Sequence, residues 1–196
     1  MSGMAFANVA TVTTAASEER AEASAAKPWD VPTISAETGV LWQIGTGTPI
    51  SYRLVPTQVA WRSRPVFARE LGDGSQLVLR NRFGLLGTWV QHGPETFYAA
   101  VTASPSIEWW DAAGRWGVYG GAGGGLGLID ATDVPGGQGQ DFTFNWFMRG
   151  GVERVIGPRT SVTAGILYQH MSNGGQTDPN PGIDALGFSL GVAWRY

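Results

Sequence analysis

Residues 186–196 read LGFSLGVAWRY, and this stretch decides the fold class. Every second position holds a large apolar or aromatic side chain, and the positions between them hold small or polar residues. Successive side chains of a β-strand point to opposite faces, so the pattern predicts a strand with one large apolar face and one small or polar face. The large positions are Leu186, Phe188, Leu190, Val192, Trp194 and Tyr196.

The same alternation recurs upstream in segments that are separated by turn signals. The clearest separators are GDG at 72–74, PGGQG at 135–139 and the long run NGGQTDPNPG at 173–182. Glycine, proline and asparagine clusters of this kind mark turns and loops. Together these signals predict eight strands, at about 34–44, 51–68, 76–90, 96–110, 115–130, 141–154, 159–172 and 184–196.

The composition is that of a β-barrel rather than of a soluble enzyme. Charged residues make up 15% of the 196 residues, where a soluble domain carries about 25%. The chain has 29 glycines, nine tryptophans and no cysteine, which excludes disulfides, thiolate metal sites and cysteine nucleophiles. The net charge of −3 provides no basic surface for nucleic acid. Without an apolar run of 18 residues no membrane helix is predicted, but membrane strands remain open.

The two faces of the strands decide between a membrane barrel and a soluble one. A soluble barrel such as a lipocalin would turn its large apolar face inward, and the small and charged face would then form a poor soluble exterior. An outer-membrane barrel turns the apolar face toward lipid and packs the small and charged face inside. We therefore predict an all-β, eight-stranded antiparallel transmembrane β-barrel of the outer membrane. The charged residues expected to pair inside it are Glu37, Arg80, Arg82, Glu108, Arg149 and Arg195.

The barrel is predicted over residues 33–196, and residues 1–32 are interpreted as a low-complexity leader or partial signal region without a fold. The last strand, with its final aromatic residue, resembles the assembly signal of bacterial outer-membrane barrels. An even number of strands places both termini on the same side, which is the periplasmic side in such barrels. The longer loops at 131–140 and 173–183 then face outward, and the short turns at 111–114 and 155–158 face the periplasm.

One group of polar residues is predicted to meet on the apolar face. His170 and Ser172 are two residues apart, so they point to the same side of their strand. Asp184 begins the next strand and points to the same face as the large apolar residues of that strand. An antiparallel hairpin brings it beside His170 and Ser172. Serine needs a base to act as a nucleophile, histidine serves as one near neutral pH, and a carboxylate orients the imidazole. His-x-Ser alone is a weak motif, and the competing interpretation is of interfacial polar residues at a strand end.

The motif around these residues resembles the signature of PagL-type lipid A 3-O-deacylases. It runs His170-x-Ser172-Asn173-x-Gly175 and then Asn180-x-Gly182-Ile183-Asp184. The resemblance implies an eight-stranded outer-membrane barrel in which Ser172 is the nucleophile, His170 the base and Asp184 the acid. It further implies that the Gly175 N–H and the Asn180 amide stabilise the oxyanion, and that Asn173 supports the loop. The family has Glu where this chain has Asp184, whose carboxylate is one methylene closer to the backbone.

The function that the resemblance implies is hydrolysis of the 3-O-linked acyl chain of lipid A. The substrate would be lipopolysaccharide, the reaction would pass through an acyl-enzyme, and no cofactor, metal or nucleotide is expected. The site would lie toward the outer leaflet of the outer membrane. The alternative is a non-catalytic small outer-membrane barrel with a structural or adhesive role, which explains the alternation and the glycine content equally well. The sequence leaves acyl-chain preference, activity on phospholipids and homodimer formation open.

Overall fold

A computed structural model describes residues 27–45 and 50–196, which form nine antiparallel β-strands. Residues 1–26 of the predicted leader lie outside the described residues, as does most of the turn at 45–49. Within the described ranges no helix is long and apolar enough to cross a membrane. The strands are β1 (Thr33–Gln43), β2 (Arg53–Arg62), β3 (Phe67–Glu70), β4 (Gln76–His92), β5 (Phe97–Trp110), β6 (Trp116–Ile129), β7 (Phe142–Val155), β8 (Thr160–Ser172) and β9 (Ile183–Arg195).

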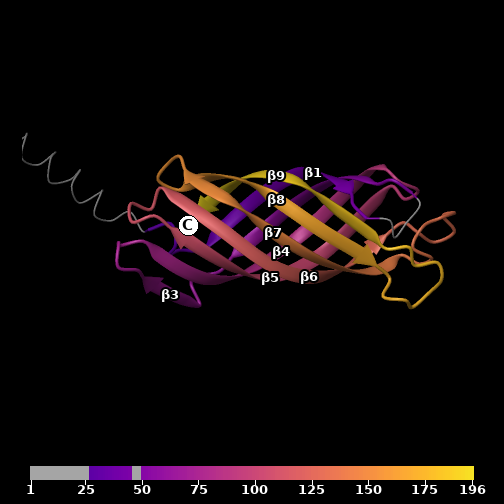
Figure 1. The fold of residues 1–196 in the computed structure, drawn as a ribbon, viewed down its shortest axis with the longest axis horizontal. Coiled ribbons are helices and arrows are strands. Elements are labelled where there is room, and N and C mark those ends of the chain that lie inside the picture. Colours follow the sequence, from indigo (N-terminus) through magenta and orange to yellow (C-terminus); the bar gives the residue numbers. More distant parts are fainter. Residues whose placement is uncertain (1–26, 46–49) are drawn as a thin grey trace, which may run out of the picture.

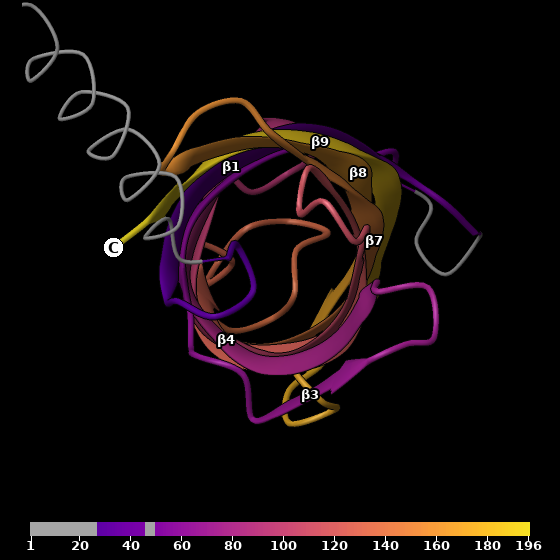
Figure 2. The same ribbon diagram turned by 90° about the vertical axis from the view of Figure 1, so that its left-hand side faces the viewer.

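Eight of these nine strands close into a barrel. The strand order is β2-β1-β9-β8-β7-β6-β5-β4-β3, and the additional pairing of β2 with β4 closes the ring. Figure 2 shows the closed ring, with β3 outside it. The predicted eight-stranded antiparallel barrel is confirmed.

The single strand predicted over 51–68 is wrong in its second part. β2 ends at Arg62, and the chain then leaves the wall of the barrel through Ser63, Arg64 and Pro65 before β3 begins. Proline has no N–H to donate to a neighbouring strand, which favours such an exit. β3 then pairs only with the first residues of β4, from Phe67 opposite Leu79 to Glu70 opposite Gln76.

The large apolar side chains lie on the outside of the barrel. On β9, Phe188 and Leu190 are 67% and 65% exposed, whereas the inward-facing Ala193 is fully buried. The outward face continues around the ring with Leu85, Val101, Leu128 and many other exposed large apolar residues. This arrangement contradicts the lipocalin-like alternative and matches a barrel whose outer surface contacts lipid.

The interior carries charges that are paired with one another. Arg62 contacts Glu108 and Glu153 through Nη1 at 3.2 and 2.8 Å, and Arg80 Nε lies 3.3 Å from Glu108 Oε2. The predicted pairing inside the barrel is thus confirmed for Arg80 and Glu108, and Arg62 and Glu153 extend it.

A second interior group is centred on Glu37. Its two carboxylate oxygens contact Arg82 Nη2 at 2.8 Å and Arg149 Nη1 at 3.0 Å. Arg195 also lies inside, but its guanidinium donates to Ser161 Oγ and to the carbonyl of Gly157 rather than forming a close ion pair.

Inward-facing glycines let neighbouring strands of this narrow barrel approach closely. A Cβ added at Gly123 would lie 2.3 Å from the carbonyl oxygen of Ala103, and one at Gly125 would lie 2.2 Å from that of Val101. Glycine on the inner face of β6 therefore permits the curvature that closes the ring.

The end of the barrel near the C-terminus is filled by an apolar cluster of Trp29, Val78 and Trp110. Trp29 belongs to the segment interpreted from the sequence as a leader, yet it is only 6% exposed. Arg80 donates to the carbonyl oxygens of Pro28 at 2.9 Å and Val31 at 2.8 Å. Residues 27–32 thus pack into the barrel end, although the sequence places the start of the barrel at residue 33.

We expect Glu108→Ala to destabilise the barrel strongly. The substitution leaves the buried Arg62 and Arg80 without this carboxylate, and removing one partner of a buried ion pair costs about 3–5 kcal/mol. Urea-induced unfolding of the barrel refolded in lipid vesicles measures the change. Glu70→Ala, on the exposed strand β3, serves as the control and is expected to unfold like the wild type. Equal unfolding midpoints for the two variants would contradict the structural role of the interior ion pairs.

Candidate active site

The candidate site lies where β8 ends and β9 begins, at the end of the barrel opposite to the C-terminus and β3 (Figure 1). β8 and β9 are antiparallel neighbours, and their register places His170 directly opposite Asp184. On the other side of β8, His170 lies opposite Trp146 of β7, and Ser172 lies opposite Phe144. The outward-facing side chains of β7, β8 and β9 thus lie side by side on the outer surface at this point of the barrel.

Hydrogen bonds join the three predicted residues in a line. His170 Nε2 lies 3.1 Å from Ser172 Oγ, and His170 Nδ1 lies 2.9 Å from Asp184 Oδ1. The side chains of His170 and Asp184 are 25% and 38% exposed. One imidazole nitrogen is therefore within hydrogen-bond distance of a hydroxyl and the other of a carboxylate. These three side chains, the Ser172 group, are accessible from the outside of the barrel.

The backbone below this group is anchored by buried apolar residues. Met171 lies between His170 and Ser172 and points inward, and Ile183 precedes Asp184 and does the same. Both are fully buried in the apolar cluster that fills this end of the barrel. The alternation of the two strands thus places polar groups on the outer face and buried apolar residues on the inner face.

Tyr168 is a further member of this group, and the sequence analysis did not single it out. Its hydroxyl donates to Asp184 Oδ1, the same oxygen that contacts His170. Tyr168, His170 and Ser172 are spaced two residues apart on β8 and share one face. The two-residue spacing could have indicated from the sequence that Tyr168 lies beside His170. It could not indicate the hydrogen bond to Asp184, because that bond depends on the register of β8 against β9.

The loop 173–182 is organised by the buried side chain of Asn173. Its Nδ2 donates to the carbonyl oxygens of Thr177 at 2.7 Å and of Gln138 at 2.5 Å. The second contact ties this loop to the loop between β6 and β7. Asn173, which the resemblance implied as a support of the loop, thus lies buried within it and donates hydrogen bonds to backbone carbonyls.

The two residues predicted to bind the oxyanion both contact Asn173. The Gly175 N–H donates to Asn173 Oδ1 at 2.8 Å, so it is not directed into open space. The Asn180 Oδ1 accepts a hydrogen bond from the backbone N–H of Asn173 at 3.0 Å. Within the described residues the Nδ2 group of Asn180 donates no hydrogen bond. Of the two predicted donors, the Gly175 N–H therefore has an acceptor within the loop, whereas Asn180 Nδ2 has none among the described residues.

Gly182 brings the end of the loop against the imidazole. Its φ of +66° lies in the left-handed region, which side chains other than glycine rarely adopt. A Cβ at this position would lie 3.5 Å from His170 Cε1. Glycine in the Asn-x-Gly part of the motif therefore lets the backbone turn beside the histidine and enter β9 at Ile183.

Another buried polar contact supports the loops at this end of the barrel. The Tyr52 hydroxyl donates to Glu95 Oε2 at 2.8 Å, and both side chains are nearly inaccessible to solvent. Burial raises the pKa of the Glu95 carboxyl above its usual value. Within residues 27–45 and 50–196 no group of three or more His, Asp or Glu side chains is arranged to hold a metal ion.

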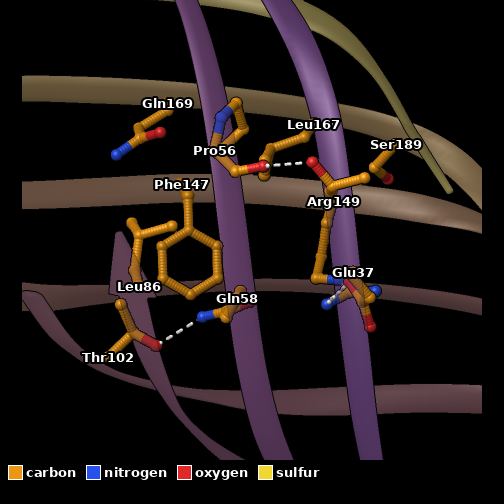
Figure 3. A pocket seen from close by; sticks show the side chains of 11 residues that line it. Glu37, Pro56, Gln58, Leu86, Thr102, Phe147, Arg149, Leu167, Gln169 and Ser189 are labelled. Carbon is orange, nitrogen blue, oxygen red and sulfur yellow. Dashed lines mark hydrogen bonds and ion pairs between the residues drawn. The ribbon is translucent and has the colours of Figure 1, made fainter. Parts of the chain in front are cut away.

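Among the described residues, the barrel encloses a small internal cavity. Figure 3 shows an internal cavity whose lining includes Glu37, Gln58, Phe147 and Arg149. Its volume of about 30 Å³ leaves room for water molecules but not for a lipid. The Ser172 group does not line this cavity and faces the outer surface of the wall. There Trp146 and Leu186 are 45% and 41% exposed.

The fold and the outer apolar face define a small outer-membrane β-barrel. A model of the family "Lipid A 3-O-deacylase (PagL)" matches residues 57–193. The crystal structure of the outer membrane enzyme PagL is similar with a TM-score of 0.54 and 19% identity, covering 84% of this chain and 99% of that one. Neisserial surface protein A (NspA) is similar with a TM-score of 0.54 and 16% identity, covering 84% and 97%. A search of curated protein sequences found no significant match.

The family match covers more than half of the chain, so the protein belongs to the lipid A 3-O-deacylase (PagL) family. The resemblance noted in the sequence is confirmed at the level of the family. The matched range includes β8, the loop 173–182 and most of β9, which carry the motif.

Proposed function

We propose that the protein is an outer-membrane esterase that hydrolyses the 3-O-linked acyl chain of lipid A. The observation that carries the proposal is the line of hydrogen bonds from Ser172 through His170 to Asp184 on the outward face of the barrel. Polar residues on a lipid-facing surface are costly and are retained for function. Membership of the family supplies the substrate class.

The proposed reaction is acyl transfer to Ser172. Its Oγ attacks the ester carbonyl while His170 Nε2 takes the hydroxyl proton. The tetrahedral intermediate then expels the sugar oxygen, which receives that proton from His170. Water then attacks the acyl-enzyme while His170 takes one of its protons. The bond between the acyl carbon and Ser172 Oγ breaks, Oγ takes back the proton from His170, and the fatty acid leaves. Asp184 keeps the Nδ1 proton of the imidazole in place and stabilises the imidazolium that forms in each step.

The oxyanion of each intermediate needs hydrogen-bond donors. Asn180 Nδ2 is the first candidate, because the family motif points to it and it has no other acceptor among the described residues, while Asn180 Oδ1 is held by the Asn173 N–H. The Gly175 N–H would become the second donor on exchanging its present acceptor, Asn173 Oδ1, for the substrate oxygen. Catalytic hydrogen bonds of a free enzyme often take their final geometry only with substrate bound. One such donor contributes about 3 kcal/mol to the stabilisation of the transition state.

The place of the group supports a lipid of the outer leaflet as substrate. The group lies on the outer face of the wall among exposed apolar side chains, where an acyl chain is within reach. It lies at the end opposite to the C-terminus, and in outer-membrane barrels the longer loops at that end face the cell exterior. Lipopolysaccharide occupies that leaflet in Gram-negative bacteria, and its ester bonds lie near the membrane surface.

A purely structural or adhesive barrel is the alternative. The similarity to NspA shows that the same fold occurs in a surface protein, and a fold alone does not define a function. That alternative assigns no role to the hydrogen-bonded group of Ser172, His170 and Asp184. We therefore favour the esterase.

Mass spectrometry of lipid A tests the proposal directly. The protein is expressed in a Gram-negative host whose lipid A keeps its 3-O-linked 3-hydroxyacyl chains, and lipid A is extracted from the outer membrane. We expect a new species lighter by one 3-hydroxyacyl chain, absent from the host with an empty vector. Unchanged lipid A, with folding of the barrel verified by heat-modifiable gel migration, would contradict the proposed substrate.

A further inference from the structure

Asp184 shares one oxygen between two donors. Its Oδ1 contacts His170 Nδ1 and accepts a hydrogen bond from the hydroxyl of Tyr168. Tyr168 lies opposite Leu186 in the β8–β9 register, and His170 lies opposite Asp184. The phenol therefore reaches diagonally across the strand pair to the carboxylate, a distance that long side chains span.

The ring of Trp146 holds both partners of this carboxylate from the other side. Its centroid lies 4.8 Å from that of Tyr168 and 5.8 Å from that of His170. Tilted aromatic pairs at these distances are attractive beyond their buried area. The tyrosine and the imidazole thus have defined orientations before any substrate binds.

The exposure of Asp184 makes the tyrosine contact important. Its short side chain is 38% exposed. A half-exposed carboxylate is free to turn toward water unless another group holds it. The Tyr168 hydroxyl fixes the oxygen that faces the imidazole, and hydrogen bonds to charged groups are stronger than neutral ones.

We propose that Tyr168 is a positioning residue for the reaction, acting through Asp184. The proposal rests on the proposed function only in taking Ser172 as the nucleophile and His170 as its base. Tyr168 itself touches neither the reacting oxygen of Ser172 nor the imidazole by a hydrogen bond. Its effect is therefore expected on the activation of Ser172 and not on substrate binding.

The experiment compares Tyr168→Phe with the matched control Tyr196→Phe. Both remove one phenolic hydroxyl from the outer surface, and Tyr196 accepts a hydrogen bond from Trp61 Nε1 at the far end of the barrel. The first measurement is the rate at which a fluorophosphonate reagent labels Ser172 in refolded barrel, which needs no lipid A. The second is kcat and KM for lipid A deacylation.

We expect Tyr168→Phe to lower both the labelling rate and kcat about tenfold, which corresponds to the loss of one hydrogen bond to a charged group, with KM unchanged. Tyr196→Phe is expected to behave like the wild type. In an Asp184→Ala background, Tyr168→Phe should slow labelling no further, because the hydroxyl acts only through the carboxylate. Non-additivity of this kind is the sign of residues that act as one unit.

Wild-type labelling and kcat in Tyr168→Phe would overturn the proposal. An equal loss with and without Asp184 would also overturn it, because the tyrosine would then act by another route. A wild-type barrel that is labelled at Ser172 but leaves lipid A intact would refute the proposed substrate and still decide the role of Tyr168 from the labelling rates. A folded wild-type barrel that is not labelled would overturn both proposals.

Discussion

Replacing Ser172 by alanine is expected to abolish the release of the acyl chain from lipid A. The variant lacks the oxygen that lies 3.1 Å from His170 Nε2 and that would form the acyl-enzyme. Loss of a serine nucleophile that works with a histidine lowers kcat by a factor on the order of 10⁶. The barrel should still fold, because the outward-facing hydroxyl is not part of the buried core. Quantitative mass spectrometry of lipid A after expression of each variant measures the effect.

The matched control for this substitution is Ser189→Ala. Ser189 lies on the neighbouring strand β9 but lines the internal cavity instead of the outer surface. It should leave deacylation unchanged, which separates loss of the nucleophile from a general effect of removing a serine hydroxyl from the wall. Deacylation by folded Ser172→Ala barrel at the wild-type rate would rule out Ser172 as the nucleophile.

Asp184→Asn is expected to lower kcat by a factor on the order of 10⁴, as such a change does in a serine triad. The amide is nearly the same size as the carboxylate, so the fold and the position of the loop should persist. It can turn its NH₂ group toward His170 Nδ1, which leaves the imidazole proton on Nε2, facing Ser172. A histidine in that tautomer cannot accept the serine proton. Steady-state kinetics with purified lipopolysaccharide in detergent micelles give kcat and KM for this comparison.

Asp178→Asn provides the control, because it makes the same chemical change in the adjoining loop 173–182 without contacting the imidazole. Its kcat is expected to match that of the wild type. If Asp184→Asn deacylated lipid A as fast as this control, Asp184 would not be the third member of the group. The motif would then need another acid to orient His170.

The alternation of large apolar residues with small or polar ones made the strands and their lipid-facing sides predictable from the sequence. Which side of each strand is apolar depends only on the residues of that strand, so Phe188 and Leu190 could be assigned to the lipid-facing side without knowing any neighbour. The same local rule placed His170 and Ser172 on one face. The hairpin between β8 and β9 then brought Asp184 beside them, because consecutive antiparallel strands joined by one loop are neighbours. The family signature added roles to these residues that spacing by itself left open.

Contacts between segments were decided only by the tertiary structure. The hydrogen bond from Tyr168 to Asp184 needs the register of β8 against β9, which no single strand determines. The acceptor of the Gly175 N–H likewise follows from how Asn173 turns into its loop.

The same distinction holds at the other end of the barrel, where β3 leaves the wall and Trp29 packs against Trp110. A strand pattern reports which face of a segment is apolar, and that is a local property. The partner of a polar or aromatic group depends on strands brought together from distant parts of the chain. The sequence alone therefore determined the barrel and the face that carries the candidate site, whereas the tertiary structure decided which side chains complete that site.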